Sequence, residues 1–183
     1  LEHAIHDASP AVRLAARAGL ERCGGAAGGD SDLDAALADA LHGSDPAARR
    51  TARKELRTLV LCGRVDQKWD KRLEMLAGAF ADGIDRAEIG DALAEIAARH
   101  RTRVARRCNR MLEARDDPHP RVRAALLRWA GYAGQHDQLA WIIDHLASED
   151  RDWSAAAREG VSALGSVGSN ALLRELAYGK RSK

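Results

Sequence analysis

One short phrase recurs in this chain and restricts its fold more than any other feature. A proline closes a polar turn, an arginine stands three residues after it, and an alanine-rich apolar run follows. The phrase occurs as Ser9-Pro10-Ala11-Val12-Arg13-Leu14-Ala15-Ala16, as Asp45-Pro46-Ala47-Ala48-Arg49-Arg50-Thr51-Ala52, and as His119-Pro120-Arg121-Val122-Arg123-Ala124-Ala125-Leu126. Self-similar segments at a regular spacing are the signature of repeat architectures. The chain is therefore expected to be an array of similar units.

Each phrase marks the start of a predicted helix. Proline suits the first turn, where no backbone donor is needed, and Ser9 or Asp45 just before it can cap the free amides. Asp85 and Asp152 hold the capping place in units that lack the proline. Residues 1–7 are expected to be the tail of a helix, and 24–31, with its run of glycines, a flexible connection. The 3.6-residue periodicity predicts further helices at 10–23, 32–42, 46–61, 67–81, 85–99, 101–115, 120–133, 137–147, 153–165 and 170–178.

These helices fall into pairs of nearly constant length. The second members start near Pro10, Pro46, Arg86, Pro120 and Trp153, so that the spacings are 36, 40, 34 and 33 residues. Two helices of three or four turns with short loops need about that length. Only 7 aromatic residues stand against 37 alanines, which indicates small side chains between closely packed helices. We expect an all-α fold, an α-solenoid of about five to six stacked antiparallel helix pairs in a single repeat domain of residues 1–183.

The ends of the sequence differ from each other. The first predicted helix begins with Leu1 and Ile5 and has no polar capping unit before it, whereas the chain closes with the polar run Gly179-Lys180-Arg181-Ser182-Lys183. Terminal repeats of a solenoid need a polar outer face. The chain is therefore expected to be the C-terminal part of a longer protein.

The Asp-Pro or Ser-Pro turn, the arginine and strings such as Val122-Arg123-Ala124-Ala125-Leu126 resemble HEAT repeats. The resemblance is specific in three units, loose in two, and spans nearly the whole chain. The units are shorter than the roughly 40 to 47 residues usual for that family, which leaves short HEAT-like variants or another helical-pair repeat open. The tetratricopeptide repeat is the nearest competitor by length, but its tryptophan, glycine and tyrosine landmarks do not recur. The resemblance implies scaffolding or target recognition within a larger protein.

Basic side chains form two stripes in the middle of the array. Residues 1–43 hold 3 basic and 7 acidic side chains, while the remainder holds 26 and 20. In the predicted helix 101–115, four arginines fall within about 100° of each other on a helical wheel, opposite Val104, Cys108, Met111 and Leu112. These four are Arg103, Arg106, Arg107 and Arg110, and the second stripe is formed by Arg49, Arg50, Arg53, Lys54 and Arg57, opposite Ala48, Ala52, Leu56 and Leu59.

Two interpretations of the stripes stay open. They could follow a phosphate backbone, in which case counterion release would make binding depend steeply on salt. They could also be solvated or paired faces, because Glu88, Asp91 and Glu95 form an acidic stripe that stacking would bring beside residues 49–57. Exposed pairs of this kind contribute only about 0 to 1 kcal/mol but can fix the register between units. No comparable acidic stripe is expected near residues 103–110, which makes that stripe the better candidate for an anionic partner.

Tryptophans are the largest apolar side chains in this alanine-rich sequence. Trp129 and Trp141 stand among apolar residues and are assigned to the core. Trp69 and Trp153 stand in polar surroundings at predicted helix starts. Each is a candidate binding anchor if exposed, with packing over a neighbouring turn as the alternative.

No pattern predicts a catalytic, cofactor-binding or metal site. His3 and His6 have a spacing that can bind metal, but no third ligand accompanies them, and Asp144 and His145 point to different faces of one helix. The glycines of 24–29 lack the lysine and hydroxyl residue of a phosphate-binding loop. Cysteine is expected as small buried thiols at positions 23, 62 and 108. Their odd number, without a visible leader, favours a reducing, cytoplasmic compartment.

The function expected from these observations is a non-enzymatic interaction module that holds a protein or peptide on the surface lined by the second helix of each pair. The alternative is nucleic-acid binding through the arginine stripes. Some HEAT-like proteins are DNA glycosylases that grip the DNA backbone, although their tryptophan and carboxylate cleft cannot be matched to residues here. A HEAT-like lyase acting on a pigment has no motif in its favour. No apolar run approaches the roughly 18 residues that span a bilayer, so no membrane partner is expected.

Overall fold

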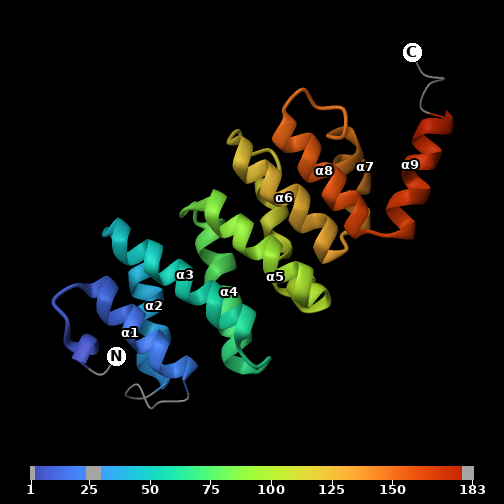
Figure 1. Ribbon diagram of the computed structural model, residues 1–183. Helices are drawn as coiled ribbons and strands as arrows, with labels where there is room; N and C mark the ends of the chain where they lie inside the picture. The colour runs from blue at the N-terminus through green and yellow to red at the C-terminus, as the bar shows by residue number, and fades with distance from the viewer. Residues whose placement is uncertain (1–2, 24–29, 179–183) are drawn as a thin grey trace. The chain divides into compact units, whose positions relative to one another are not determined.

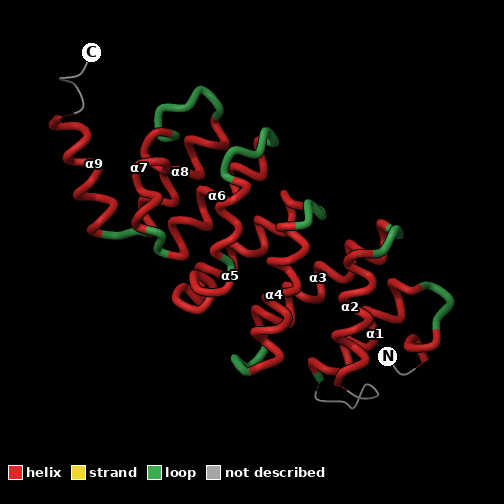
Figure 2. Tube along the Cα trace, turned by 180° about the vertical axis from the view of Figure 1, so that it is seen from behind, coloured by secondary structure: helices red, strands yellow, loops and turns green. Residues whose placement is uncertain are grey.

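The computed structural model describes residues 3–23 and 30–178, and these residues form helices, turns and loops without any strand (Figures 1 and 2). The expectation of an all-α chain is confirmed for this part of the sequence. The chain groups into two compact units, an N-terminal unit, Leu1–Ile84, and a C-terminal unit, Asp85–Lys183. The helices, with 3-10 helices written η, are η1 (His3–His6), α1 (Pro10–Arg22), α2 (Asp30–His42), α3 (Pro46–Cys62), α4 (Gln67–Ala81), α5 (Arg86–Arg107), η2 (Asn109–Ala114), α6 (Pro120–Ala133), η3 (His136–Gln138), α7 (Leu139–Asp144), α8 (Arg151–Ala163) and α9 (Ser166–Tyr178).

Proline marks the first residue of three helices, α1, α3 and α6, as predicted from the recurrent phrase. The expected cap at Asp45 is confirmed, because its Oδ1 accepts a hydrogen bond from the backbone N–H of Ala47 at 2.9 Å. The expected cap at Ser9 is wrong, because its side chain makes no capping bond. Instead, the Asp7 carboxylate accepts the backbone N–H of Ser9 at 2.8 Å and shapes the turn.

Of the two caps predicted without proline, one position is confirmed and one is wrong. Asp85 holds the N-cap position of α5, but in the left-handed region, with φ of 39°, and its side chain makes no capping bond. Asp152 lies inside the first turn of α8, and Asp150 is the cap, since its Oδ1 accepts from Asp152 N at 2.9 Å and Trp153 N at 3.2 Å. A single sequence offers two aspartates here, and only the backbone geometry decides which one caps.

The arginine of the recurrent phrase folds back over its own turn in all three copies. Each guanidinium donates to the backbone carbonyl oxygen of the residue three positions before the proline. The three bonds are Arg13 Nη1 to Asp7 O (2.7 Å), Arg49 Nη1 to Gly43 O (2.8 Å) and Arg123 Nη2 to Asp117 O (3.0 Å). Gly43 and Asp117 are half-buried, and a carbonyl without a partner in such a place costs free energy, so the arginine stabilises these turns. The phrase is therefore a turn motif with a structural reason of its own.

In the N-terminal unit, α3 contacts α1, α2 and α4. The core contains Leu14, Leu37, Leu56 and Phe80, all buried. In α1, Leu14 and Ala18 are buried, whereas Val12 is 41% exposed. The predicted tail of a helix at 1–7 is a 3-10 helix over its described part, and residues 24–29 of the predicted connection lie outside the described residues.

In the C-terminal unit, α6 packs between α5 and α8. Its apolar face buries Leu126, Leu127 and Trp129 completely. α6 and α8 approach closely at two glycines, because a Cβ added to Gly131 would lie 2.3 Å from the Cα of Gly160. α7 and α9 pack on the remaining side of α8.

The predicted break between helices 85–99 and 101–115 is confirmed, because two helical stretches of α5 meet at a kink at His100, but the second stretch ends well before residue 115. α5 continues to Arg107 with a kink at His100, whose φ and ψ are −127° and 43°. Cys108 then leaves the helical region, and Asn109–Ala114 is a 3-10 helix. Similarly, the helix predicted at 137–147 divides into η3 and the short α7. No proline or glycine lies between residues 91 and 117, so neither residue type signals the end of α5 at Arg107.

Candidate interaction surfaces

The strongest accumulation of charge is an arginine segment, defined here as residues 99–110. It contains six arginines and no acidic residue, and every one of these arginines is exposed. They are Arg99, Arg101, Arg103, Arg106, Arg107 and Arg110. On the opposite side Val104, Cys108 and Met111 are buried, as predicted, while Leu112 is half-buried. The segment thus lies against the core by one side and presents its charges to solvent.

One part of the predicted stripe at 103–110 is wrong. Arg103, Arg106 and Arg107 belong to α5, whereas Arg110 lies in η2, beyond the break at Cys108. Arg110 Nε forms an exposed pair with Glu113 Oε1 at 3.4 Å. A single helical wheel therefore does not describe the four residues, although all four remain exposed.

The basic stripe on α3 is less uniform. Its apolar face is buried as predicted, at Ala48, Ala52, Leu56 and Leu59. On the other face, Arg50 and Lys54 are exposed, whereas three arginines are half-buried. These three are Arg49, Arg53 and Arg57, and Arg49 is held by the carbonyl of Gly43. The α3 stripe therefore offers fewer exposed cations than the arginine segment, and its pairing with the acidic stripe stays a prediction.

The acidic residues on α5 pair with α6. Arg121 Nη1 lies 3.3 Å from Glu88 Oε1, and Arg121 Nη2 lies 3.5 Å from Asp91 Oδ2. Arg128 also pairs with Asp91. On the other side of α6, the Tyr132 hydroxyl donates to Glu159 of α8; these residues of α5, α6 and α8 are called the mixed-charge surface.

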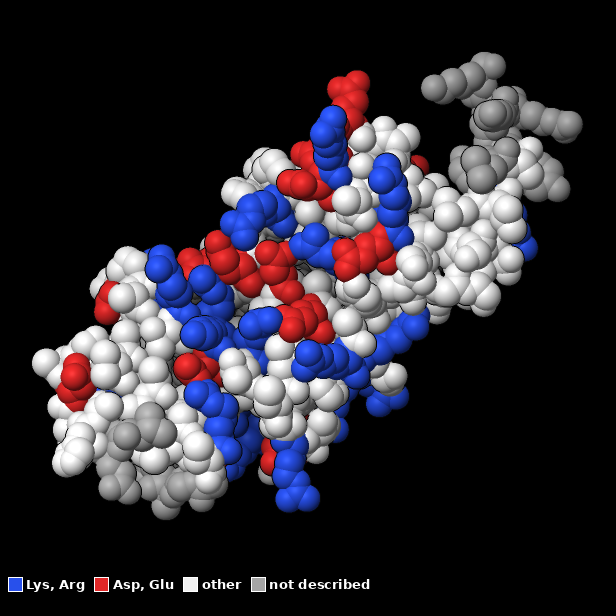
Figure 3. Space-filling view, viewed as in Figure 1, with Lys and Arg blue, Asp and Glu red and all other residues white. Residues whose placement is uncertain are grey.

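Positive and negative side chains interleave over this surface (Figure 3). The contact with Glu159 changes the pKa of Tyr132. The hydrogen bond to Glu159, followed by partial burial and the negative charge of that carboxylate, raises the pKa of the Tyr132 phenol. A neutral donor is favoured because ionisation would place two negative charges side by side.

Of the two alternatives left open for Trp69, the exposed anchor is wrong. Its side chain is only 2% exposed, and its indole N–H donates to the carbonyl of Val60 at 2.7 Å. Trp69 lies in the first turn of α4 and faces α3, whereas its polar neighbours in sequence lie on other sides of the helix.

Trp153 is half-buried and engaged within its own unit. Its indole N–H donates to the carbonyl of Pro120 at 2.9 Å, and the Arg123 guanidinium lies over its ring at 4.2 Å. The His145 ring lies 5.7 Å away. Trp153 therefore packs over the turn that begins α6, which is the alternative to an anchor. Of the two core assignments, Trp129 is confirmed as fully buried, whereas Trp141 is half-buried.

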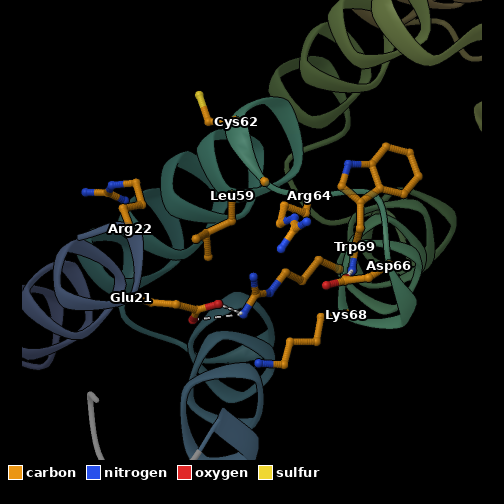
Figure 4. Close-up of a pocket in the computed structure, with 10 residues that line it drawn as sticks. Glu21, Arg22, Leu59, Cys62, Arg64, Asp66, Lys68 and Trp69 are labelled. Atoms are coloured by element: carbon orange, nitrogen blue, oxygen red, sulfur yellow. Dashed lines mark hydrogen bonds and ion pairs between the residues drawn. The ribbon is translucent and has the colours of Figure 1, made fainter. Parts of the chain in front are cut away.

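A pocket of about 410 Å³ opens in the N-terminal unit. It lies between the end of α1, the end of α3 and the start of α4 (Figure 4). Its lining residues are Glu21, Arg22, Leu59, Cys62, Gly63, Arg64, Asp66, Lys68, Trp69 and Arg72. The volume suits a small ligand, but the lining charges are of both signs, and two of the cations are already paired.

Arg72 at the floor of this pocket is the centre of a buried charge cluster. Its Nε donates to Asp34 Oδ1 at 2.7 Å, and its Nη2 reaches both carboxylate oxygens of Glu21, at 2.7 and 2.9 Å. Burial lowers the pKa of Arg72, but the hydrogen bonds and charges of Asp34 and Glu21 outweigh it, so the pKa is raised. Nearby, Arg22 pairs with Glu55.

Sequence reasoning missed this cluster. One signal was present, because Arg72 lies on the apolar face of α4 with Trp69, Leu73 and Leu76 at helical spacing. A charged residue on such a face indicates a buried partner. Its two acidic partners, 38 and 51 residues away, could not be found from spacing.

The exposure of the cysteines differs from the sequence prediction. Cys23 and Cys62 are exposed and only Cys108 is buried, so the prediction of buried thiols is wrong for two of three. His3 and His6 are both exposed. Among residues 3–23 and 30–178, no group of three metal-ligating side chains comes together.

Neither of two comparisons with known proteins assigns this chain to a family. A scan against protein-family models gives no match, and a search of curated proteins gives no significant match. Within the described ranges, no helix has the length and apolar character needed to cross a membrane.

Proposed function

We propose that this chain is a non-enzymatic interaction module of HEAT-like helix pairs, stacked as an α-solenoid, which binds a protein partner on its mixed-charge surface. The repeated arginine turn supports the repeat assignment, because three helix starts share both the residues and the hydrogen bond. The packing of α6 between α5 and α8 supports the stacking of successive second helices.

The observation that carries the proposed partner is the composition of the mixed-charge surface. It combines Glu88 and Asp91 of α5, Arg121 and Arg128 of α6, and Glu159 of α8. A phosphate backbone would meet repulsion from the carboxylates, whereas a protein surface can supply complementary charges of both signs. Tyr132 adds an amphipathic side chain of the kind enriched at protein interfaces.

A photocrosslinking experiment tests this proposal. Benzoylphenylalanine replaces Ala155, an exposed residue of α8 one helical turn before Glu159. The matched control replaces Ala140, which is exposed on α7. In the cells that produce the protein, a discrete protein adduct is expected from position 155 and not from position 140.

A second variant connects the adduct to the surface. Glu159→Lys reverses one charge and is expected to reduce the adduct from position 155 without changing the helical circular dichroism signal. Equal adducts at both positions, or an adduct removed by nuclease and not by protease, would contradict a protein partner at this surface.

A further inference from the structure

The pocket at the ends of α1 and α3 has the size of a small-molecule site, and all of its lining residues belong to the N-terminal unit. Its volume of about 410 Å³ lies within the range of roughly 300–1,000 Å³ in which ligand pockets fall. Figure 4 shows which lining side chains are directed to a bound molecule. Glu21, Arg64 and Asp66 point toward the middle of the pocket, whereas Arg22 and Cys62 point away from it.

Arg72 supplies a fixed donor at the floor of this pocket. The residue is only 5% exposed, and three hydrogen bonds to Asp34 and Glu21 occupy its Nε and Nη2. Among the residues that the structure describes, no hydrogen bond engages its Nη1. Because Arg72 lines the pocket, the two N–H groups of Nη1 can donate to a ligand. The guanidinium is already held in place by its two carboxylates, so a ligand need not order it.

Arg64 is a second donor on the rim of the pocket. It follows the end of α3, is exposed, and pairs with no carboxylate in the described part of the chain. A guanidinium binds a carboxylate through two parallel hydrogen bonds. Arg64 and Arg72 therefore make one side of the pocket a site for a carboxylate group.

Asp66 gives the pocket an anionic side. Its Oδ1 accepts the backbone N–H of Trp69 at 2.9 Å and so caps α4. The cap holds the carboxylate in one position, and Oδ2 can accept from a ligand. Glu21 adds a second carboxylate, although both of its oxygens already accept from Arg72.

The charges of the pocket match a molecule that carries both signs. Four cations and two carboxylates line it. Two further carboxylates, Glu55 and Asp34, pair with lining arginines from outside the lining, so these groups number four of each sign. A small anion would meet repulsion from the carboxylates, and a small cation would meet repulsion from the arginines. A zwitterion places each of its charges beside a group of opposite sign.

We propose that this pocket binds a free amino acid with an aliphatic side chain. Arg64 and Nη1 of Arg72 donate to the α-carboxylate of the ligand, and Oδ2 of Asp66 accepts from its α-ammonium group. Leu59, which faces the same space in Figure 4, contacts the aliphatic side chain. This activity belongs to the N-terminal unit and does not depend on the protein partner proposed for the mixed-charge surface.

The test is a heteronuclear NMR titration of the full chain with L-leucine, followed at the Gly63 amide and the Trp69 indole, since both residues line the pocket. Two further probes keep the side chain and remove one charge each: N-acetyl-L-leucine lacks the ammonium charge, and L-leucinamide lacks the carboxylate charge. The Trp129 indole of the C-terminal unit is the internal reference and is expected not to shift. For a ligand of this size, a Kd of about 1 mM is expected for leucine.

Two variants test the two sides of the pocket. Arg64→Gln removes a cation, and Asp66→Asn removes the negative charge but keeps the cap of α4, because the asparagine oxygen accepts the same hydrogen bond. The matched control is Arg50→Gln, at an exposed arginine of α3 outside the pocket. Circular dichroism confirms that all three variants are folded.

Each test variant is expected to bind leucine about 10-fold more weakly, while the control keeps the wild-type affinity. Arg64→Gln should also distinguish leucine less well from leucinamide, and Asp66→Asn less well from N-acetyl-leucine. Absence of saturable shifts at up to about 10 mM leucine, equal binding of the three probes, or an equal loss in Arg50→Gln would overturn the proposal. Tighter binding of N-acetyl-leucine than of leucine would indicate an anion site and would also overturn it. None of these outcomes changes the crosslinking result expected for the mixed-charge surface.

Discussion

The contact between α6 and α8 can be tested with one methyl group. A Cβ introduced by Gly131→Ala would lie 2.3 Å from both the Cα and the carbonyl oxygen of Gly160. Non-bonded carbon atoms pack at about 3.5–4.0 Å, so the two helices must separate by about 1 Å or more. Both partners in the clash are backbone atoms, which means that no change of rotamer can relieve it.

The size of the effect follows from two opposing contributions. Overpacking of a core costs about 1–3 kcal/mol, occasionally more, and the short distance places this site at the upper end. Alanine in a helix interior recovers about 1 kcal/mol relative to glycine. We expect Gly131→Ala to lower the free energy of unfolding of the C-terminal unit by about 2 kcal/mol. For a unit of this size, that lowers Tm by roughly 8–16 °C.

Two further substitutions make the experiment decisive. Gly160→Ala would place its Cβ 2.7 Å from the carbonyl oxygen of Leu127, so a smaller loss is expected. Gly78→Ala is the control, because Gly78 is exposed on α4 and a Cβ there would meet nothing within 4 Å. It is expected to raise the stability of the N-terminal unit by about 0.5–1 kcal/mol. Calorimetry and urea unfolding followed by circular dichroism measure all three, and a neutral or stabilising Gly131→Ala would refute the close approach.

Three other predictions follow from side-chain contacts. Arg72→Met leaves the buried Asp34 carboxylate without this partner. It is expected to lower the free energy of unfolding, measured in urea, by about 3–5 kcal/mol. Adding Asp34→Leu should recover most of that loss, and failure to recover it would contradict the pairing. Arg123→Ala removes the hydrogen bond from its guanidinium to the carbonyl of Asp117 and should lower the free energy of unfolding by about 0.5–1.5 kcal/mol in the same assay. An unchanged stability would contradict the structural role of the arginine in the recurrent phrase. Because the pKa of Tyr132 is raised in the folded protein, its stabilising contribution is present below pH of about 10, the ordinary value for tyrosine, and is lost as the pH rises above it. Ultraviolet titration of wild type, Tyr132→Phe and Glu159→Gln checks this, and titration at an ordinary pKa in wild type would contradict the hydrogen bond.

Local signals in the sequence identified most helices and one exposed charged surface. Apolar spacing gave α4 with the bounds observed, and apolar spacing with a proline start did the same for α6, because the fixed φ and the missing donor of proline act within one turn. The exposure of Arg103 and Arg106 was predictable for a similar reason, since the apolar Val104 and Cys108 nearby in sequence face the core. The same argument failed at Arg110, because the wheel assumed a helix up to residue 115, whereas α5 ends at Arg107.

The amino-acid sequence by itself determined that the chain is helical and where its recurrent turns and its densest positive charge lie, because these depend on neighbouring residues. Tertiary structure alone decided which polar side chains are buried and with what. Trp69 and Arg72 stand among charged neighbours in sequence, yet both are buried, because α4 packs its first turns against elements that precede it. The pairing of Arg72 with Asp34, 38 residues away, and the approach of Gly131 to Gly160 require two helices to meet in space. Such contacts leave no periodic pattern in the sequence, since each depends on a single residue of a distant helix.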